Sequence, residues 1–248
     1  GLTVATDTGK FALNSSSITS VGALTLTGAT GIDFGAGVAF TAGGDLSMST
    51  SSGDLVGAGA LTLTSTGDIS LSENLTTAGT TVITADSDGN GAGDFSMGAS
   101  TRLSAGNNSL TLTANDISVS GSISSGTGST TIAVSDGGTI GLGGTSGNMT
   151  IDGTELSKIT AGTLNIGNSS TGNITVDGIS AANSSNVSTV NLTAASGSNV
   201  SFANNDSTFN ALTVSGGSTS FGDGLTVATD TGKFALNSSS ITSVGALT

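Results

Sequence analysis

The 248-residue chain contains no proline, no cysteine and no histidine. Without cysteine it can form neither disulfides nor thiolate metal sites, and without histidine it lacks the commonest metal ligand and general base. Proline cannot donate a hydrogen bond to a β-ladder, so its absence is typical of a chain whose backbone is paired along nearly every strand. These absences point away from metal and acid–base chemistry and towards extended β-structure.

Basic side chains are scarce, because 4 Lys and Arg stand against 17 Asp and Glu, for a net charge of −13. Contacts to phosphate need Lys and Arg, so neither nucleic acid nor an anionic membrane is expected as a partner. No apolar run approaches ~18 residues, which predicts no membrane span. The basic residues Lys10, Arg102, Lys158 and Lys233 lie far apart in sequence, and no acid–base constellation is visible, so we expect no enzymatic activity.

What the chain does contain is strict alternation of apolar and polar residues. In Leu61-Thr62-Leu63 and again in Ile69-Ser70-Leu71 the apolar residues share one face, which is typical of a strand with one buried side. The intervening residues 65–68, Ser-Thr-Gly-Asp, have the composition of a turn. Related pairs of runs begin at Leu24, Leu110, Leu164 and Val190. Each run is too short for a core of its own, so the copies are expected to stack.

The spacing of these copies predicts the fold class. Their first apolar residues fall at positions 24, 46, 61, 82, 110, 132, 149, 164, 190 and 212. Coils of about 20 residues with two or three short strands match an all-β parallel β-helix, or β-solenoid, and the crossover rule makes it right-handed. Essentially no α-helix is expected. Glu155 and Lys158 stand at helical spacing, but Gly153 and Gly162 flank them too closely for a stable helix.

A β-sandwich is the alternative fold, because strands at intervals of 8–12 residues are typical of sandwiches too. Its best support is the dipeptide Asp177-Gly178, which follows Ile174-Thr175-Val176 as a hairpin turn would. A sandwich does not account for the similarity between coils.

A longer repeat is superimposed on the coils. Residues 1–25, here called segment N, are identical to residues 224–248, here called segment C, at an offset of 223 residues. The repeat predicts that residues 1–248 form one continuous solenoid, excerpted from a longer array with about eleven coils per repeat. Self-association, by end-to-end continuation and by lateral contact, is the expected partnership.

The sharpest local motif is an acidic loop. Asp86, Asp88 and Asn90 alternate before Gly91, as ligands do in the first half of a calcium loop, and Asp94 would close the shell. Met97 occupies the position where an EF-hand carries its bidentate glutamate. These four residues are the candidate Ca²⁺ ligands, and the alternative is a solvated acidic corner. No other cofactor is expected.

An aspartate pair and several threonine pairs resemble known kinds of site. Asp68 and Asp116 occupy similar positions two coils apart, at a separation of roughly 10 Å that would suit paired carboxylates of a glycosidase, but a turn role is simpler. Pairs such as Thr25/Thr27, Thr62/Thr64 and Thr111/Thr113 point outward as in an array that binds ice or another surface. The equivalent positions elsewhere hold Ser47/Ser49, Thr150/Asp152, Asn165/Gly167 and Asn191/Thr193, which favours an ordinary strand surface.

The coil pattern LTLT…GDI…L…TT, best seen over residues 61–77, resembles the repeat region of filamentous-haemagglutinin-type exoproteins and of long bacterial β-strand-repeat surface proteins. The resemblance covers essentially the whole chain. It implies a secreted, cell-surface, fibre-forming right-handed β-helix. The expected function is therefore a non-catalytic structural segment of an extracellular fibre or stalk, and the alternative is an adhesin module that binds a cell-surface ligand through an exposed solenoid face.

Overall fold

The computed structural model describes residues 1–14 and 16–244 of the chain. In this part the regular structure is nearly all β, with 4% helix, and stacked parallel strands form a β-solenoid of about 11 turns with roughly 22 residues per turn. The solenoid prediction is confirmed, with slightly longer coils than expected. The β-sandwich is excluded because every described strand pairing is parallel. The right-handed sense stays a prediction.

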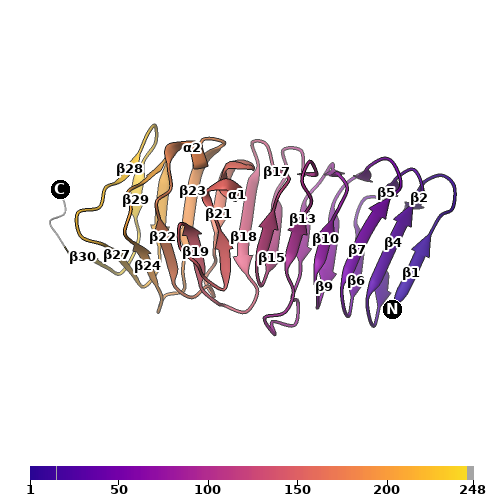
Figure 1. The fold of residues 1–248 in the computed structure, drawn as a ribbon, viewed down its shortest axis with the longest axis horizontal. Coiled ribbons are helices and arrows are strands. Elements are labelled where there is room, and N and C mark those ends of the chain that lie inside the picture. The colour runs from indigo at the N-terminus through magenta and orange to yellow at the C-terminus, as the bar shows by residue number, and fades with distance from the viewer. Residues whose placement is uncertain (15, 245–248) are drawn as a thin grey trace. The chain divides into compact units, whose positions relative to one another are not determined.

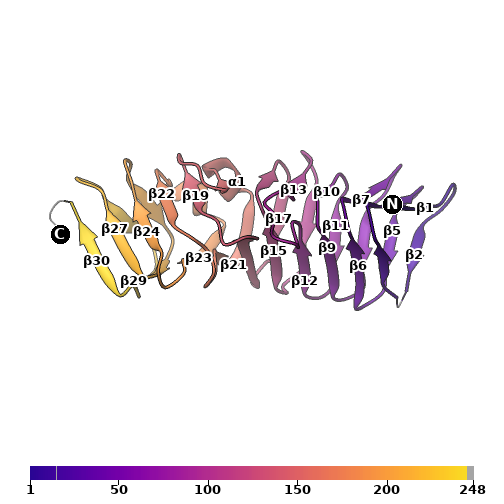
Figure 2. The ribbon, with the colours of Figure 1, turned by 90° about the horizontal axis from the view of Figure 1, so that it is seen from below.

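The chain divides into two compact units, Gly1–Thr130 and Thr131–Thr248. Each turn of the first unit consists of three strands, one in each of three parallel sheets named A, B and C. Figure 1 shows β1, β4, β7, β10 and β13 of sheet A side by side, and Figure 2 shows β6, β9 and β12 of sheet C side by side.

The strand bounds of the first unit are as follows. Sheet A comprises β1 (Leu2–Ala5), β4 (Leu24–Gly28), β7 (Leu46–Thr50), β10 (Ile69–Leu71), β13 (Phe95–Met97) and β16 (Ile117–Val119). Sheet B comprises β2 (Phe11–Leu13), β5 (Ile32–Phe34), β8 (Leu55–Gly57), β11 (Leu75–Thr77), β14 (Arg102–Ser104) and β17 (Ser122–Ser124). Sheet C comprises, in this unit, β3 (Ile18–Ser20), β6 (Val38–Ala42), β9 (Leu61–Ser65), β12 (Thr81–Thr84) and β15 (Leu110–Ala114).

The core of the first unit consists of apolar columns that run through the stack. Leu61, Leu63, Ile69 and Leu71 point inward as predicted, and each is at most 2% exposed. Parallel pairing in register places identical or similar side chains directly above one another, so every turn buries its apolar pairs against those of its neighbours. One column of sheet A consists of Leu2, Leu24, Leu46, Ile69, Phe95 and Ile117.

The predicted alignment of the coils is partly wrong. It places Leu24 with Leu61, but Leu24 lies in sheet A, in the column of Ile69, whereas Leu61 lies in sheet C beside Val38. All three strands of a turn show the same alternation, so the pattern alone does not tell one sheet from another. The widely scattered spacings arise from counting strands of different sheets as one series. Along the sheet A column the steps are 22, 22, 23, 26 and 22 residues.

The second unit contains two main sheets, a strand pair and two short helices, and β18 (Ser129–Val134) precedes them at the boundary in sequence. Sheet D comprises β20 (Met149–Ile151), β19 (Ile140–Gly143), β22 (Ile174–Asp177), β24 (Asn199–Phe202), β27 (Ser218–Phe221) and β30 (Ser240–Ser243). The β21 sheet comprises, in this unit, β21 (Ile159–Ile166), β23 (Val187–Thr193), β26 (Leu212–Ser215) and β29 (Phe234–Leu236). The remaining pair is β25 (Ser207–Phe209) with β28 (Val227–Thr229).

A short helix occupies the stretch where no stable helix was expected. Helix α1 (Gly153–Ser157) begins at a capping box in which the Asp152 carboxylate accepts the Glu155 N–H at 2.8 Å and the Glu155 carboxylate accepts the Asp152 N–H at 3.1 Å. These reciprocal bonds satisfy the first backbone donors, which is why the flanking glycines do not prevent one turn of helix. Helix α2 (Ala181–Ser184) contacts α1, and Asn183 Nδ2 donates to the Gly153 carbonyl at 2.8 Å.

The Asp177-Gly178 dipeptide does not form a hairpin. Asp177 ends β22 and Gly178 follows it before α2, in the left-handed region at φ +69°, and β22 pairs in parallel with β19 and β24. The sandwich signal is therefore a turn between two elements of a coil. No helix in the described part of the chain is long and apolar enough to cross a membrane.

Segments N and C fold alike. In segment N the strands are β1, β2 and β3; in segment C they are β28, β29 and β30, and β2 and β29 span the same positions of the repeat. The last four residues of segment C, including the expected coil start at position 247, lie outside the described residues. The same sequence thus forms three short strands in both units, although β28 begins two positions later in the repeat than β1.

Candidate functional site

A column of aspartates runs along one corner of the first unit. Asp45, Asp68, Asp94 and Asp116 each stand one residue before the first buried residue of a sheet A strand, in β7, β10, β13 and β16. The strands are in register, so the four carboxylates follow one another at one strand spacing, about 4.8 Å per turn. We call these four residues the aspartate corner.

Hydrogen bonds link each turn of the aspartate corner to the next. The Asp68 N–H donates to Asp45 Oδ1 at 3.1 Å, the Asp94 N–H to Asp68 Oδ1 at 2.9 Å, and the Asp116 N–H to Asp94 Oδ1 at 3.1 Å. A corner N–H points along the stack where no strand ladder reaches it, and the carboxylate of the preceding turn supplies the missing acceptor. The corner therefore acts as a side-chain extension of the backbone ladder.

This geometry bears on the paired carboxylates Asp68 and Asp116. They lie two turns apart as expected, and Asp94 stands between them. The carboxylate of Asp68 accepts the N–H of Asp94, and that of Asp116 accepts the N–H of Ile117 at 2.8 Å. Both carboxylates thus serve the backbone of the corner, which supports the turn role over a glycosidase pair.

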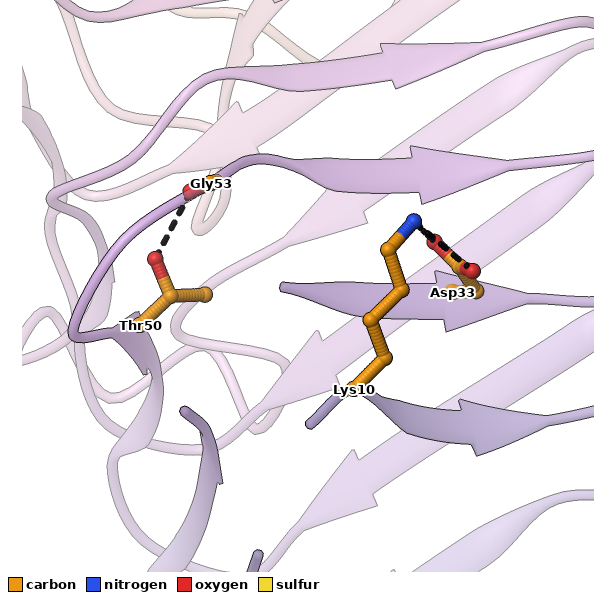
Figure 3. A network of polar contacts seen from close by, with 4 residues as sticks. All are labelled: Lys10, Asp33, Thr50 and Gly53. Atoms are coloured by element: carbon orange, nitrogen blue, oxygen red, sulfur yellow. Dashed lines mark hydrogen bonds and ion pairs between the residues drawn. The ribbon is translucent and has the colours of Figure 1, made fainter. Parts of the chain in front are cut away.

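The basic residues lie on separate elements. Lys10, one residue before β2, contacts the carboxylate of Asp33 in β5 with its Nζ at 3.0 and 3.1 Å, and both side chains are about half exposed (Figure 3). An exposed pair of this kind contributes less than about 1 kcal/mol to stability. Arg102 opens β14, and its backbone N–H donates to Asn74 Oδ1 at 2.9 Å. The same view shows the turn after β7, closed by a 2.7 Å bond from Thr50 Oγ1 to the Gly53 carbonyl.

The acidic loop between β12 and β13 winds around one buried carboxylate. Asp86 is 1% exposed and adopts a left-handed conformation at φ +51°. Its Oδ1 accepts the Asn90 N–H at 2.9 Å, and its Oδ2 accepts the Gly91 N–H at 3.1 Å. Asn90 Nδ2 in turn donates to Asp88 Oδ2 at 2.9 Å. The loop is therefore held by its own side chains.

The four candidate calcium ligands do not share one arrangement. Asp86, Asp88 and Asn90 bond to one another within the loop, whereas Asp94 Oδ1 accepts Asn115 Nδ2 and the Asp116 N–H from the next turn. Among the described residues no group of three or more acidic side chains is placed to hold a metal ion. Calcium binding stays a prediction, and an ion would compete with the backbone N–H groups that now occupy both oxygens of Asp86.

The outward threonines align differently from the expected order. Thr25 and Thr27 do lie beside Ser47 and Ser49 in sheet A, where the Ser47 hydroxyl donates to that of Thr25 at 3.3 Å. Thr62 and Thr64 belong to sheet C instead. There one outward column holds threonine on four successive strands, at 41, 64, 84 and 113, while the other holds Ala39, Thr62, Val82 and Thr111. The same pair does not recur on every coil, in agreement with an ordinary strand surface.

Sequence reasoning missed a buried carboxylate in the second unit. Asp177, at the end of β22, is 4% exposed. Its Oδ1 accepts the Asn205 N–H at 3.0 Å and Asn205 Nδ2 at 2.8 Å, and its Oδ2 accepts Asn204 Nδ2 at 3.0 Å. Burial raises the pKa of Asp177, but the hydrogen bonds from Asn204 and Asn205 outweigh burial and hold its pKa below the usual value.

The one sequence signal for Asp177 is its position directly after Ile174-Thr175-Val176, and by sequence alone that position is interpreted as part of a hairpin turn. In the second unit asparagine takes the corner role at positions 173 and 199, and an asparagine pair also links the neighbouring strands β21 and β23. The Asn199 N–H donates to Asn173 Oδ1 at 2.9 Å, and Asn191 Nδ2 donates to Asn165 Oδ1 at 2.9 Å. These polar side chains thus join turn to turn within each unit.

Comparisons with known proteins add no relative: no protein-family model, no curated protein and no solved structure matches the chain.

Proposed function

We propose that this chain is a structural segment of an extracellular fibre or stalk, built from tandem solenoid turns and without chemistry of its own. The proposal rests on the identical sequences of segments N and C and on the three strands that each of them forms. The two segments begin 223 residues apart. A spacer can reuse one turn unchanged, because any turn serves as well as another, whereas a receptor site needs one special turn.

The polar side chains support the same proposal. The aspartate corner and the asparagine bonds connect consecutive turns, and Asp86 holds its own loop. The described contacts of these side chains stabilise the solenoid scaffold. A net charge of −13 keeps such a polar surface soluble and discourages phosphate-bearing partners. The extracellular, cell-surface location follows from the resemblance to secreted fibre-forming exoproteins and is part of the proposal.

Electron microscopy of the native material tests the proposal. At roughly 22 residues per turn, the 223-residue repeat holds about ten turns, rather than the eleven expected from sequence. At ~4.8 Å per turn one repeat would rise about 48 Å. We expect fibres of uniform width with an axial period near this value and a meridional diffraction spacing near 4.8 Å.

The opposite outcome would favour the adhesin module. A compact monomer that binds a defined cell-surface ligand, and that never forms part of a fibre, would contradict the structural role. Binding that maps to one exposed face and survives dilution to single molecules would identify that face as a receptor site.

A further inference from the structure

The loop between β12 and β13 contains the one Asn-Gly dipeptide of the chain, Asn90-Gly91. Glycine has no side chain, so nothing on Gly91 shields its backbone nitrogen from the side-chain amide of the residue before it. Both residues are exposed, and Gly91 adopts a left-handed conformation at φ +78°. Water therefore reaches the dipeptide, and burial does not protect the amide of Asn90.

Asparagine is a thermolabile residue, and an Asn-Gly dipeptide can lose ammonia without an enzyme. Hydroxide removes the proton from the Gly91 nitrogen, and this nitrogen attacks the side-chain carbonyl carbon of Asn90. The new carbon–nitrogen bond closes a succinimide ring. The bond from that carbon to Nδ2 breaks, and Nδ2 takes a proton from water and leaves as ammonia, which restores the hydroxide. Water then adds to either ring carbonyl and gives aspartate or isoaspartate, so the reaction consumes water alone.

Asp86 holds the nitrogen that would react. The Gly91 N–H, which has to lose its proton, donates to Asp86 Oδ2 at 3.1 Å, and the Asn90 N–H donates to Asp86 Oδ1 at 2.9 Å. A carboxylate beside an N–H favours the protonated nitrogen, because the negative charge of the carboxylate repels that of an amide anion. The hydrogen bond to Asp86 therefore opposes the first step of the reaction.

Asp86 is itself fixed to the solenoid. It is 1% exposed, and the N–H of the next residue, Ser87, donates to the Ser65 carbonyl of the preceding turn at 2.9 Å. The leaving group is bound as well, since Asn90 Nδ2 donates to Asp88 Oδ2 at 2.9 Å. Two different carboxylates thus bind the nitrogen that attacks and the nitrogen that leaves.

We propose that Asn90 is a site of spontaneous deamidation that the Asp86 carboxylate protects. Asn90 keeps its amide while the loop is closed, and it converts to aspartate or isoaspartate when the loop opens and releases the Gly91 N–H. The product opposes reclosure, because a carboxylate at position 90 repels Asp88 where Nδ2 was its donor, and isoaspartate adds a backbone carbon before the Gly91 N–H. Deamidation thus records the opening of the loop. It depends on the contacts of the loop alone and not on the proposed fibre function.

Peptide mapping by mass spectrometry, during incubation of the whole chain in mildly alkaline buffer, tests the proposal. We expect Asn90 to convert about tenfold or more slowly in the folded natural chain than in the same chain unfolded in urea. Folded Asp86→Ala should lose most of this protection, because the Gly91 N–H loses its acceptor. Asp88→Ala is the matched control: it frees Asn90 Nδ2 but leaves both N–H groups on Asp86, so most of the protection should remain.

Hydrogen exchange on the natural chain decides the question even where Asp86→Ala does not fold. Exchange at Gly91 and deamidation of Asn90 both need the released Gly91 N–H, so folding should slow the two reactions by factors that agree within about threefold. Equal conversion of Asn90 in the folded and the urea-unfolded chain would overturn the proposal. Slow conversion in a folded Asp86→Ala protein would also overturn it, as would equal loss of protection in Asp86→Ala and Asp88→Ala.

Discussion

Replacing Asp177 with alanine removes the acceptor of three hydrogen bonds that join two turns of the second unit. Asn205 gives two of these bonds and Asn204 gives one, at 2.8–3.0 Å. The carboxylate is 4% exposed, so water does not readily replace it. The free energy of unfolding should therefore fall by more than for an exposed aspartate.

The expected size follows from opposing terms. Hydrogen bonds to a charged acceptor contribute about 1.5–3 kcal/mol each, and burial of the carboxylate costs part of that sum. Asn204 and Asn205 lie near solvent and can recover water as a partner. A net loss of about 3 kcal/mol is expected for Asp177→Ala. Asp177→Asn keeps one oxygen for Asn205 and loses the charge, so about 1 kcal/mol is expected.

The pH dependence has a definite sign. The pKa of Asp177 is lowered in the folded state, so the folded protein favours the ionised form. Its contribution is fully present above the unfolded pKa of about 3.9 and is lost as the pH falls through the lower folded pKa. The stability difference between the natural chain and Asp177→Ala should hold from neutral pH down to about 4 and shrink below it.

Urea unfolding followed by far-UV circular dichroism, together with hydrogen exchange over residues 200–210, measures both quantities. Asp223→Ala is the matched control, because Asp223 is exposed and no side-chain hydrogen bond is described for it. Equal effects of Asp177→Ala and Asp223→Ala at pH 7 would refute the reasoning. So would a difference that remains unchanged well below pH 3.

Three further perturbations probe the first unit. Leu63→Ala, at a fully buried position, should cost about 3 kcal/mol in urea unfolding through the cavity it leaves, whereas Thr62→Ala on the outward face should change stability by less than about 0.5 kcal/mol. Asp68→Ala should lower the free energy of unfolding by about 1 kcal/mol, because the N–H of Asp94 loses its acceptor. Asp68→Asn keeps an acceptor oxygen and should melt close to the natural chain. Equal melting temperatures of the two variants would contradict the hydrogen-bonded ladder. Asp86→Ala should speed hydrogen exchange at Asn90 and Gly91 by at least tenfold, because their N–H groups lose their acceptor. Calorimetry of the natural chain with calcium and with chelator tests whether the same loop binds an ion. A melting curve that is the same in both would leave only the scaffold role.

The sequence by itself determined the class of fold and the inward-facing residues. Alternation with a period of two makes Leu61 and Leu63 share a face regardless of what covers them, and short runs such as these must stack to bury that face. The absence of proline is consistent with a backbone paired along its length. The repeat of segment N in segment C likewise needed no structure to be seen.

Only the tertiary structure decided which strands lie above one another. Leu24 and Leu61 look alike because every strand of a turn obeys the same alternation, so the sheet to which each belongs depends on the lengths of the turns between them. The roles of Asp94 and Asp177 followed from that register, because their hydrogen-bond partners lie 21 to 28 residues further along the chain. An aspartate before a strand predicts a turn. Whether its carboxylate then contacts water, an ion or a backbone N–H depends on the neighbouring turn against which it stacks.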